Sequence, residues 1–309
     1  YKFRGFFRLQ TVNEYGKVTK DTGFFPNLIT NGGLDYIGYP QPSSGWSSFF
    51  IYSCCIGTGN TPPAYTDTTL QAGLAAVVYN STLFLSNTSY NAGPPAYWQG
   101  QKSWQFAAGT ATGNIAEIGV SPYSAGYGYT GANLPLYSRA LVVDGGGSPT
   151  VIPVLASEAL TVTYILQVYI DETSHPYTMS LSGTSYSGSW QVANVTTVPP
   201  LGMAIGFSLN SDQATPYHGG AMGPITGSPT GTSLGFANAV ITPYTLGTYY
   251  STRTYTWDIN HGNGGGIDFF LFQLANSAGQ FQMSVTPTIP KTNVYNLSIV
   301  HNTSWARYP

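Results

Sequence analysis

The sequence predicts an all-β protein of 309 residues, made of two tandem β-sandwich domains of jelly-roll or immunoglobulin-like type. Three observations predict this fold class. Apolar residues alternate with period two in many short segments, loops rich in glycine and proline separate those segments, and one sequence pattern occurs twice. Long amphipathic helices are missing from the pattern, which excludes a sheet built from alternating strands and helices. We expect the domains to span residues 1–172 and 173–309.

The first segment predicts a hairpin. Residues 1–12 alternate through Phe3, Phe7 and Leu9, a turn follows at 13–16, and residues 17–25 read as the returning strand. Further strands are predicted at residues 48–56, 74–85, 102–107, 136–143, 150–155 and 159–170.

One short helix is predicted near residues 27–38. Leu34 and Ile37 lie three residues apart, as on one face of a helix, and Asn31 is a suitable capping residue.

An internal repeat indicates that the second domain is a duplicate of the first. Trp104 precedes a Gly-Asn pair and Ile115, and Trp257 precedes a Gly-Asn pair and Ile267. Further along, an Ile-Pro pair stands seven residues before Leu160, counted from the proline, and another stands at the same distance before Leu297. Residues 177–195 are the counterpart of the opening hairpin, and 171–174 form the link between the copies.

Composition excludes several classes of protein. Charged residues make up only 7% of the chain, and 10 basic against 12 acidic residues leave no surplus of positive charge for a nucleic-acid backbone. No apolar run reaches the roughly 18 residues that a membrane-spanning helix needs. An aromatic content of 15% argues against disorder. A surface this poor in charge repels other copies weakly, which favours a protein that works in an assembly.

Motifs for catalysis and metal binding are not found in the sequence. The acidic residues are scattered, except for Asp171 and Glu172 in the predicted linker, and no histidine pair has a metal-ligand spacing. The neighbouring Cys54 and Cys55 are expected to be reduced thiols on opposite faces of a strand. We therefore expect no catalytic residue, cofactor or metal, although a glycan-cleaving enzyme stays open as an alternative.

Aromatic residues in three long loops are the candidates for binding a partner. These loops cover residues 86–100, 122–135 and 210–235, and tyrosine combines a rigid contact surface with a polar tip. Packing against another protein and stacking on a glycan are both open. The candidate contact residues are Tyr97, Trp98, Tyr123, Tyr127, Tyr129, Tyr217 and His218.

Four segments resemble a pattern common in virion proteins of tailed bacteriophages. They are FPNLITNGGLD at 25–35, IGTGNTPPAYTDTTL at 56–70, GNIAEIGV at 113–120 and LYSRA at 136–140. The resemblance extends over about residues 1–170. It implies a non-enzymatic structural protein of the tail, tail fibre or baseplate, with no cofactor, whose partners are copies of itself and other virion proteins. The alternatives are a decoration or collar protein of the head, and a module that binds a glycan or receptor on the host surface.

The same segments have a structural interpretation from their residue types. Gly57 and Gly59 turn the chain after a strand, and Pro62 and Pro63 keep the following segment extended, before Asp67 caps a short turn. Arg139 is one of the few cations, and its guanidinium is expected to pair with a carboxylate such as Glu117 and to hold two strands together.

Overall fold

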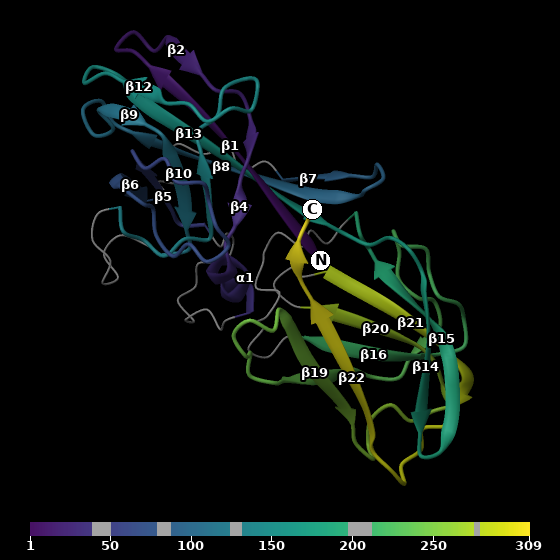
Figure 1. The fold of residues 1–309 in the computed structure, drawn as a ribbon. Helices are drawn as coiled ribbons and strands as arrows, with labels where there is room; N and C mark the ends of the chain where they lie inside the picture. The colour runs from purple at the N-terminus through teal and green to yellow at the C-terminus, as the bar shows by residue number, and fades with distance from the viewer. Residues whose placement is uncertain (39–50, 79–87, 124–131, 197–211, 275–278) are drawn as a thin grey trace.

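The computed structural model describes residues 1–38, 51–78, 88–123, 132–196, 212–274 and 279–309. These residues are built almost entirely from antiparallel sheets, with one helix among them, which confirms the predicted all-β class (Figure 1).

The first half of the chain is a sandwich of two sheets. One sheet has the order β2-β1-β13-β8-β7, with β3 and β23 also paired to β1, and the facing sheet has the order β4-β11-β10-β5-β6. A separate pair, β9 and β12, lies beside them. The bounds of these elements are β1 Lys2–Val12, β2 Val18–Asp21, β3 Phe25–Pro26, β4 Leu28–Ile29, β5 Ser53–Gly57, β6 Gly73–Val78, β7 Thr88–Asn91, β8 Tyr97–Phe106, β9 Gly113–Ile115, β10 Glu117–Ser121, β11 Ser138–Leu141, β12 Ile152–Val154, β13 Ala159–Tyr169 and β23 Ala306–Arg307.

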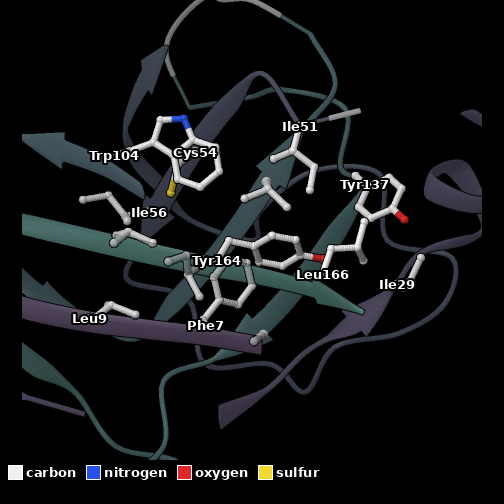
Figure 2. Close-up of a cluster of buried hydrophobic side chains, with 14 of the residues drawn as sticks. Phe7, Leu9, Ile29, Ile51, Cys54, Ile56, Trp104, Tyr137, Tyr164 and Leu166 are labelled. Carbon is white, nitrogen blue, oxygen red and sulfur yellow. The ribbon is translucent and has the colours of Figure 1, made fainter. Parts of the chain in front are cut away.

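Alternation along the long strands directs one side of each strand into the core of this sandwich. Phe7 on β1 lies directly opposite Tyr164 on β13, and their rings pack 4.8 Å apart between the sheets (Figure 2). On β5, Cys54 joins this core while Cys55 belongs to a smaller cluster on the other face, and both thiols are free, as the period-two pattern predicts.

The second half is a single sheet that bends around its own core. Its order is β14-β15-β21-β20-β16-β18-β19-β22, with β17 paired to β16, and β18 joins the two layers because it pairs with both β16 and β19. The bounds are β14 His175–Leu181, β15 Thr184–Ala193, β16 Gln213–His218, β17 Thr232–Ser233, β18 Ala237–Ile241, β19 Tyr250–Trp257, β20 Ile267–Leu274, β21 Gly279–Ile289 and β22 Leu297–Ser304.

Both halves arrange their strands in the same order. The sheet β4-β11-β10-β5-β6 corresponds to β15-β21-β20-β16-β17, and the pairs of β8 with β7 and β13 correspond to those of β19 with β18 and β22. The corresponding strands also follow one another in the same order along the chain. This agreement supports the predicted duplication independently of the sequence pattern.

The strand pairings show where the residues of the repeated sequence pattern lie in the two halves. Ile115 lies opposite Ile152 in the first half, and Ile267 lies opposite Ile289 in the second. In the second half, Trp257 itself lies opposite Leu297, the first residue of β22. In the first half, the residue opposite Leu160 is Phe106, two residues after Trp104.

The opening strand is where the halves differ. In the first half β1 pairs with β13, so it extends the sheet that contains β8. In the second half β14 forms a hairpin with β15, at the end of the sheet farthest from β22. The predicted counterpart of the opening hairpin therefore exists, but it pairs in a different place.

Helix α1, Asn31–Gly38, confirms the predicted short helix but begins differently from the prediction. The hydroxyl of Thr30, and not the side chain of Asn31, accepts the hydrogen bond from Gly33 N, at 2.9 Å. Asn31 Oδ1 instead accepts a hydrogen bond from Arg307, a contact that depends on the last residues of the chain.

Two of the predicted long loops contain strands. Residues 86–100 include β7 and the start of β8, which form a hairpin, and residues 210–235 include β16 and β17. Glycine and proline are frequent in both segments, and their density obscured the short alternating runs between them. Most of the third predicted loop, 124–131, lies outside the described residues.

The two halves contact each other around α1 and the ends of the chain. Trp305 belongs to the core of the first half, and its Nε1 donates to Leu34 O at 2.8 Å. Tyr244 OH donates to Asp35 Oδ1 at 2.7 Å. Strand β23 then pairs in parallel with β1, so the last residues of the second half complete a sheet of the first.

Candidate functional site

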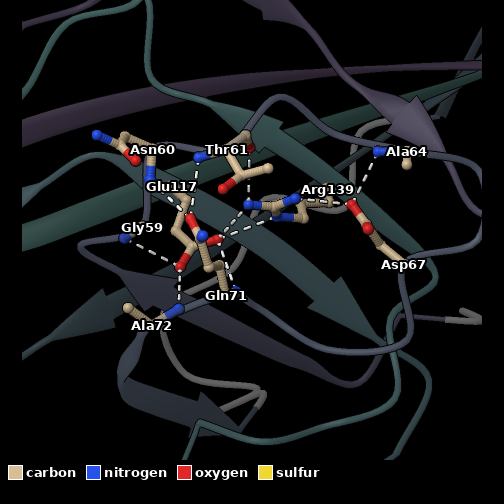
Figure 3. Close-up of polar contacts among 9 residues, drawn as sticks. All are labelled: Gly59, Asn60, Thr61, Ala64, Asp67, Gln71, Ala72, Glu117 and Arg139. Carbon is tan, nitrogen blue, oxygen red and sulfur yellow. Dashed lines mark hydrogen bonds and ion pairs between the residues drawn. The ribbon is translucent and has the colours of Figure 1, made fainter.

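A buried ionic network joins three of the four segments that carry the sequence resemblance, those at 56–70, 113–120 and 136–140 (Figure 3). Glu117 on β10 is fully buried, and Arg139 on the neighbouring β11 is 2% exposed. Arg139 donates to Glu117 Oε2 through Nε at 3.0 Å and through NH2 at 2.7 Å, which is the predicted pairing. NH1 donates to Asp67 Oδ2 at 2.7 Å, and NH2 also donates to Thr61 O at 3.0 Å.

Backbone N–H groups satisfy the remaining capacity of the Glu117 carboxylate. It accepts hydrogen bonds from the N–H groups of Gly59, Gln71 and Ala72, at 2.6 to 3.1 Å. Glycine is required for this approach, because a Cβ on Gly57 or Gly59 would lie 2.6 or 2.4 Å from Glu117 Oε1. Pro62 and Pro63 lie outside regular strands in the loop that ends at the Ala64–Asp67 turn.

This network stabilises the loop 57–72 against two strands. Every oxygen of the Glu117 carboxylate has a partner within the chain, and Asp67 Oδ2 also accepts from Ala64 N at 2.9 Å. A carboxylate satisfied in this way is held in place and not presented to a substrate. Gly57, Gly59, Asp67, Glu117 and Arg139 therefore form a structural unit.

Of the predicted contact residues on β8, Trp98 belongs to the core of the first half and Tyr97 lies on the opposite, partly exposed side of the strand. Trp98 is 7% exposed, and its Nε1 donates to Val195 O at 2.9 Å. Tyr97 is half-buried and packs against Tyr169. The prediction that Trp98 contacts a partner is therefore wrong, because β8 continues into this segment and directs the Trp98 side chain towards the second half.

The other predicted contact residues do not form one surface. Tyr123 is 37% exposed and lies edge-on to Tyr36, with 5.7 Å between the ring centroids. Tyr217 and His218 lie on β16 in the other half, and His218 Nδ1 is 3.0 Å from Gly266 O. Tyr127 and Tyr129 lie outside the described residues.

A pocket of about 380 Å³ lies in the second half, next to the junction with the first. One wall is the stretch of β22 from Ile299 to Ser304, and the opposite side includes Trp190 on β15 and Phe281 on β21. Tyr1 also lines the pocket, and its α-amino group donates to Ser304 O at 2.9 Å.

His301 is the polar group that stands out in this pocket. Its ring stacks on Phe272 at 5.1 Å, and its Nδ1 is covered and has no hydrogen-bond partner among the residues that the structure describes. Burial, assisted by the nearby Arg253 guanidinium, lowers the pKa of His301 to about 3, so the ring is neutral at pH 7. The pocket thus combines aromatic walls with an uncharged imidazole.

Sequence reasoning did not find this pocket. Its residues come from the five strands β14, β15, β20, β21 and β22, from residues 170–171 and from the first residue of the chain. No local spacing connects residues 1, 190, 281 and 301, so the sequence carries no signal for the site.

In the described part of the chain, no group of three or more histidine, cysteine, aspartate or glutamate side chains is placed to hold a metal ion. Among those residues, too, no helix has the length and apolar character to cross a membrane.

No protein-family model, curated protein or solved structure matches this chain. The functional interpretation therefore depends on the geometry of the chain itself.

Proposed function

We propose that this chain is a non-enzymatic structural component of a tailed-phage particle, in the tail, tail fibre or baseplate. It acts through homo-oligomeric assembly and through contacts with neighbouring virion proteins. The observation that carries the proposal is an uncharged sheet face on the second half, formed by the outward side chains of β18, β19 and β22.

This surface, called the valine face below, has a row of three side chains at its centre. Val240 lies opposite Thr254, which lies opposite Val300, and the two valines are 73% and 61% exposed. Threonine, serine and asparagine pairs flank the row, such as Thr252 with Asn302. No charged side chain is among the outward residues described on these strands.

Exposed β-branched residues on an uncharged sheet face suit an interface between subunits. Interface centres are depleted in charged residues, and burial of apolar surface contributes ~25 cal/mol per Å². The outward side chains of β1, in the first half, include Lys2, Arg4 and Arg8, so charge is unevenly divided between the halves. The assembly contact is therefore expected on the second half.

The network around Glu117 supports the phage part of the proposal. The segments that resemble virion proteins build a buried scaffold, which agrees with a structural role for the shared residues. A position within the tail follows from the resemblance alone.

Analytical ultracentrifugation of the full chain tests assembly. We expect the unmodified protein to form oligomers, and Val240→Lys together with Thr254→Lys to shift it to monomer, because charge is placed at the centre of the valine face. Val18→Lys, on exposed β2 of the first half, is the matched control and should leave the oligomer intact. A wild-type protein that stays monomeric at all concentrations would overturn homo-oligomeric assembly.

An image of the intact particle tests the assigned location. Symmetric copies of the chain in density of the tail, fibre or baseplate are the expected result. Density on the head, or none in the particle, would contradict it.

A further inference from the structure

Strand β22 has one paired edge and one open edge. It pairs with β19 along its whole length, and no strand in the described ranges pairs with its other edge. In the first half the corresponding strand, β13, is paired on both edges, with β8 on one side and β1 on the other. The position that β1 fills in the first half is therefore not filled by any described strand of the second.

The pocket lies where the side chains of such a strand would enter. On β1 the inward residues include Phe7, which faces Tyr164. The repeat aligns Leu160 with Leu297, so His301 holds the place of Tyr164. Among the described residues of the second half, no strand brings a counterpart of Phe7 to the free edge of β22 opposite His301. The pocket beside Trp190 and Phe281 lies at this edge. Figure 1 shows β13 and β22 for comparison.

The open edge of β22 lacks the protection that other end strands carry. Natural sheets shield free edges with charges, prolines or bulges, because unpaired N–H and C=O groups template pairing with another chain. Strand β14, at the far end of the same sheet, includes Pro176, and β2 in the first half includes Lys20 and Asp21. The β22 sequence LSIVHNTS has neither a charged residue nor a proline, with His301 neutral at pH 7.

We propose that this groove accepts an extended segment of a neighbouring protein chain, which pairs antiparallel with β22 and places large apolar side chains opposite Ile299 and His301. Backbone pairing along an open edge, with pockets for alternate side chains, is an established mode of peptide recognition. This inference rests on the proposed assembly function and names the partner of the second half.

Continuity and charge argue for this occupant. The groove begins at Tyr1, where the contact between the halves ends, and from Lys2 onward β1 already pairs with β23. Backbone pairing therefore already exists at the end of β22, through the parallel pair of β23 with β1, and the antiparallel direction of the proposed strand follows that of β1 on β13. Asp171 is the one carboxylate in the lining and the α-amino group of Tyr1 its one cation, so the inserted side chains are expected to be uncharged, like Phe3, Phe7 and Leu9 of β1.

The probe for this proposal is a synthetic peptide with the sequence of β1, KFRGFFRLQTV, labelled for fluorescence anisotropy and added to the full chain. We expect saturable binding. A matched peptide in which Phe3, Phe7 and Leu9 are replaced by serine should bind at least about tenfold more weakly, because it keeps the backbone but loses the inserted side chains.

A photo-reactive benzoylphenylalanine at the position of Phe7 locates the bound peptide. We expect cross-links, read by mass spectrometry, to β22 and to Met283, whose side chain lines the pocket. Cross-links confined to the first half would overturn the proposal, as would equal binding of the serine peptide.

A protein variant provides the reciprocal test. His301→Trp fills the pocket and should weaken binding of the β1 peptide by about tenfold or more, whereas Val240→Thr on the valine face should not change it. If His301→Trp does not fold, the cross-link on the wild-type protein decides.

The two proposals fail separately. If the chain oligomerises but does not bind the peptide, the proposed docking groove is wrong and the assembly proposal is unaffected. A monomeric chain that binds the peptide at Met283 supports the groove and overturns homo-oligomeric assembly.

Discussion

In the first half of the molecule β1 lies between β13 and β2, whereas no strand in the described part of the second half fills the corresponding position beside β22. Both halves otherwise arrange their strands in the same order. The difference arises because β14 turns back on β15 and not towards β22. The two halves thus share a sheet topology but differ in the strand beside β13 and β22, and a free edge of β22 beside an aromatic pocket is the consequence among the described residues.

The halves also bury charge in different ways. In the first, Glu117 and Arg139 are surrounded by backbone donors and acceptors from the loop 57–72. In the second, Arg253 donates through Nε to Asp212, and both side chains are 1% exposed. Each half therefore contains a buried Arg–carboxylate pair, and the pair in the first half also holds the loop 57–72 in place.

Removal of the first of these pairs should have the largest effect. Arg139→Ala leaves the buried Glu117 without its counter-ion, and breaking a buried pair costs about 3–5 kcal/mol of unfolding free energy. Chemical denaturation measures this cost. Arg8→Ala removes a partly exposed pair with Asp21 and should cost less than about 1 kcal/mol. Equal costs for the two variants would contradict the structural role of the network.

Removal of the repeated tryptophan should lower the unfolding free energy equally in the two halves. Trp104 and Trp257 are both buried, and each indole donates to a backbone carbonyl at 3.3 Å, Trp104 to Tyr52 O and Trp257 to Gly235 O. Trp104→Ala and Trp257→Ala should each lower the unfolding free energy by about 3–5 kcal/mol. The phenylalanine variants keep most of the packing and should lose only ~1 kcal/mol. If alanine at one of the two sites left the unfolding free energy unchanged, the two tryptophans would not have equivalent roles.

The histidine in the open half should make that half sensitive to acid. Because the pKa of His301 is about 3 in the folded chain and about 6.5 when unfolded, the unfolded chain binds the proton first as pH falls. Stability is therefore full above pH 6.5 and falls by ~1.4 kcal/mol per pH unit below it, reaching about 2 kcal/mol of loss at pH 5.

His301→Tyr, which places the residue of the first half at this position, is the matched variant for that effect. Denaturation at pH 7, 6 and 5 should show a weaker pH dependence in the variant than in the wild type. Parallel curves for the two proteins would show that His301 does not titrate as the buried ring requires.

Loss of the helix cap should have the smallest effect. Thr30→Ala removes the acceptor for Gly33 N and should cost ~1 kcal/mol, while Thr30→Ser keeps the hydroxyl and should cost less. Because α1 contacts Trp305 and Tyr244, the loss should also loosen the junction of the halves, as measured by hydrogen exchange at Asp35 and its neighbours. If Thr30→Ala left the unfolding free energy unchanged, Thr30 would not be the residue that caps α1.

The sequence by itself determined the local structure and the pairings that local patterns encode. Alternation through Phe3, Phe7 and Leu9 specified β1 and its buried face, and the spacing of Leu34 and Ile37 specified α1. The pairing of Arg139 with Glu117 was also predictable, since so few cations are present in this chain that few partners compete.

Only the tertiary structure decided where β14 pairs, that β23 returns to β1, and that Trp98 lies beneath Val195. Period two specifies which face of a strand is buried, but not which edge finds a neighbour, because backbone N–H and C=O groups are the same in every strand. The open edge of β22 and the pocket beside His301 follow from that choice of neighbour, which depends on contacts between residues far apart in the chain.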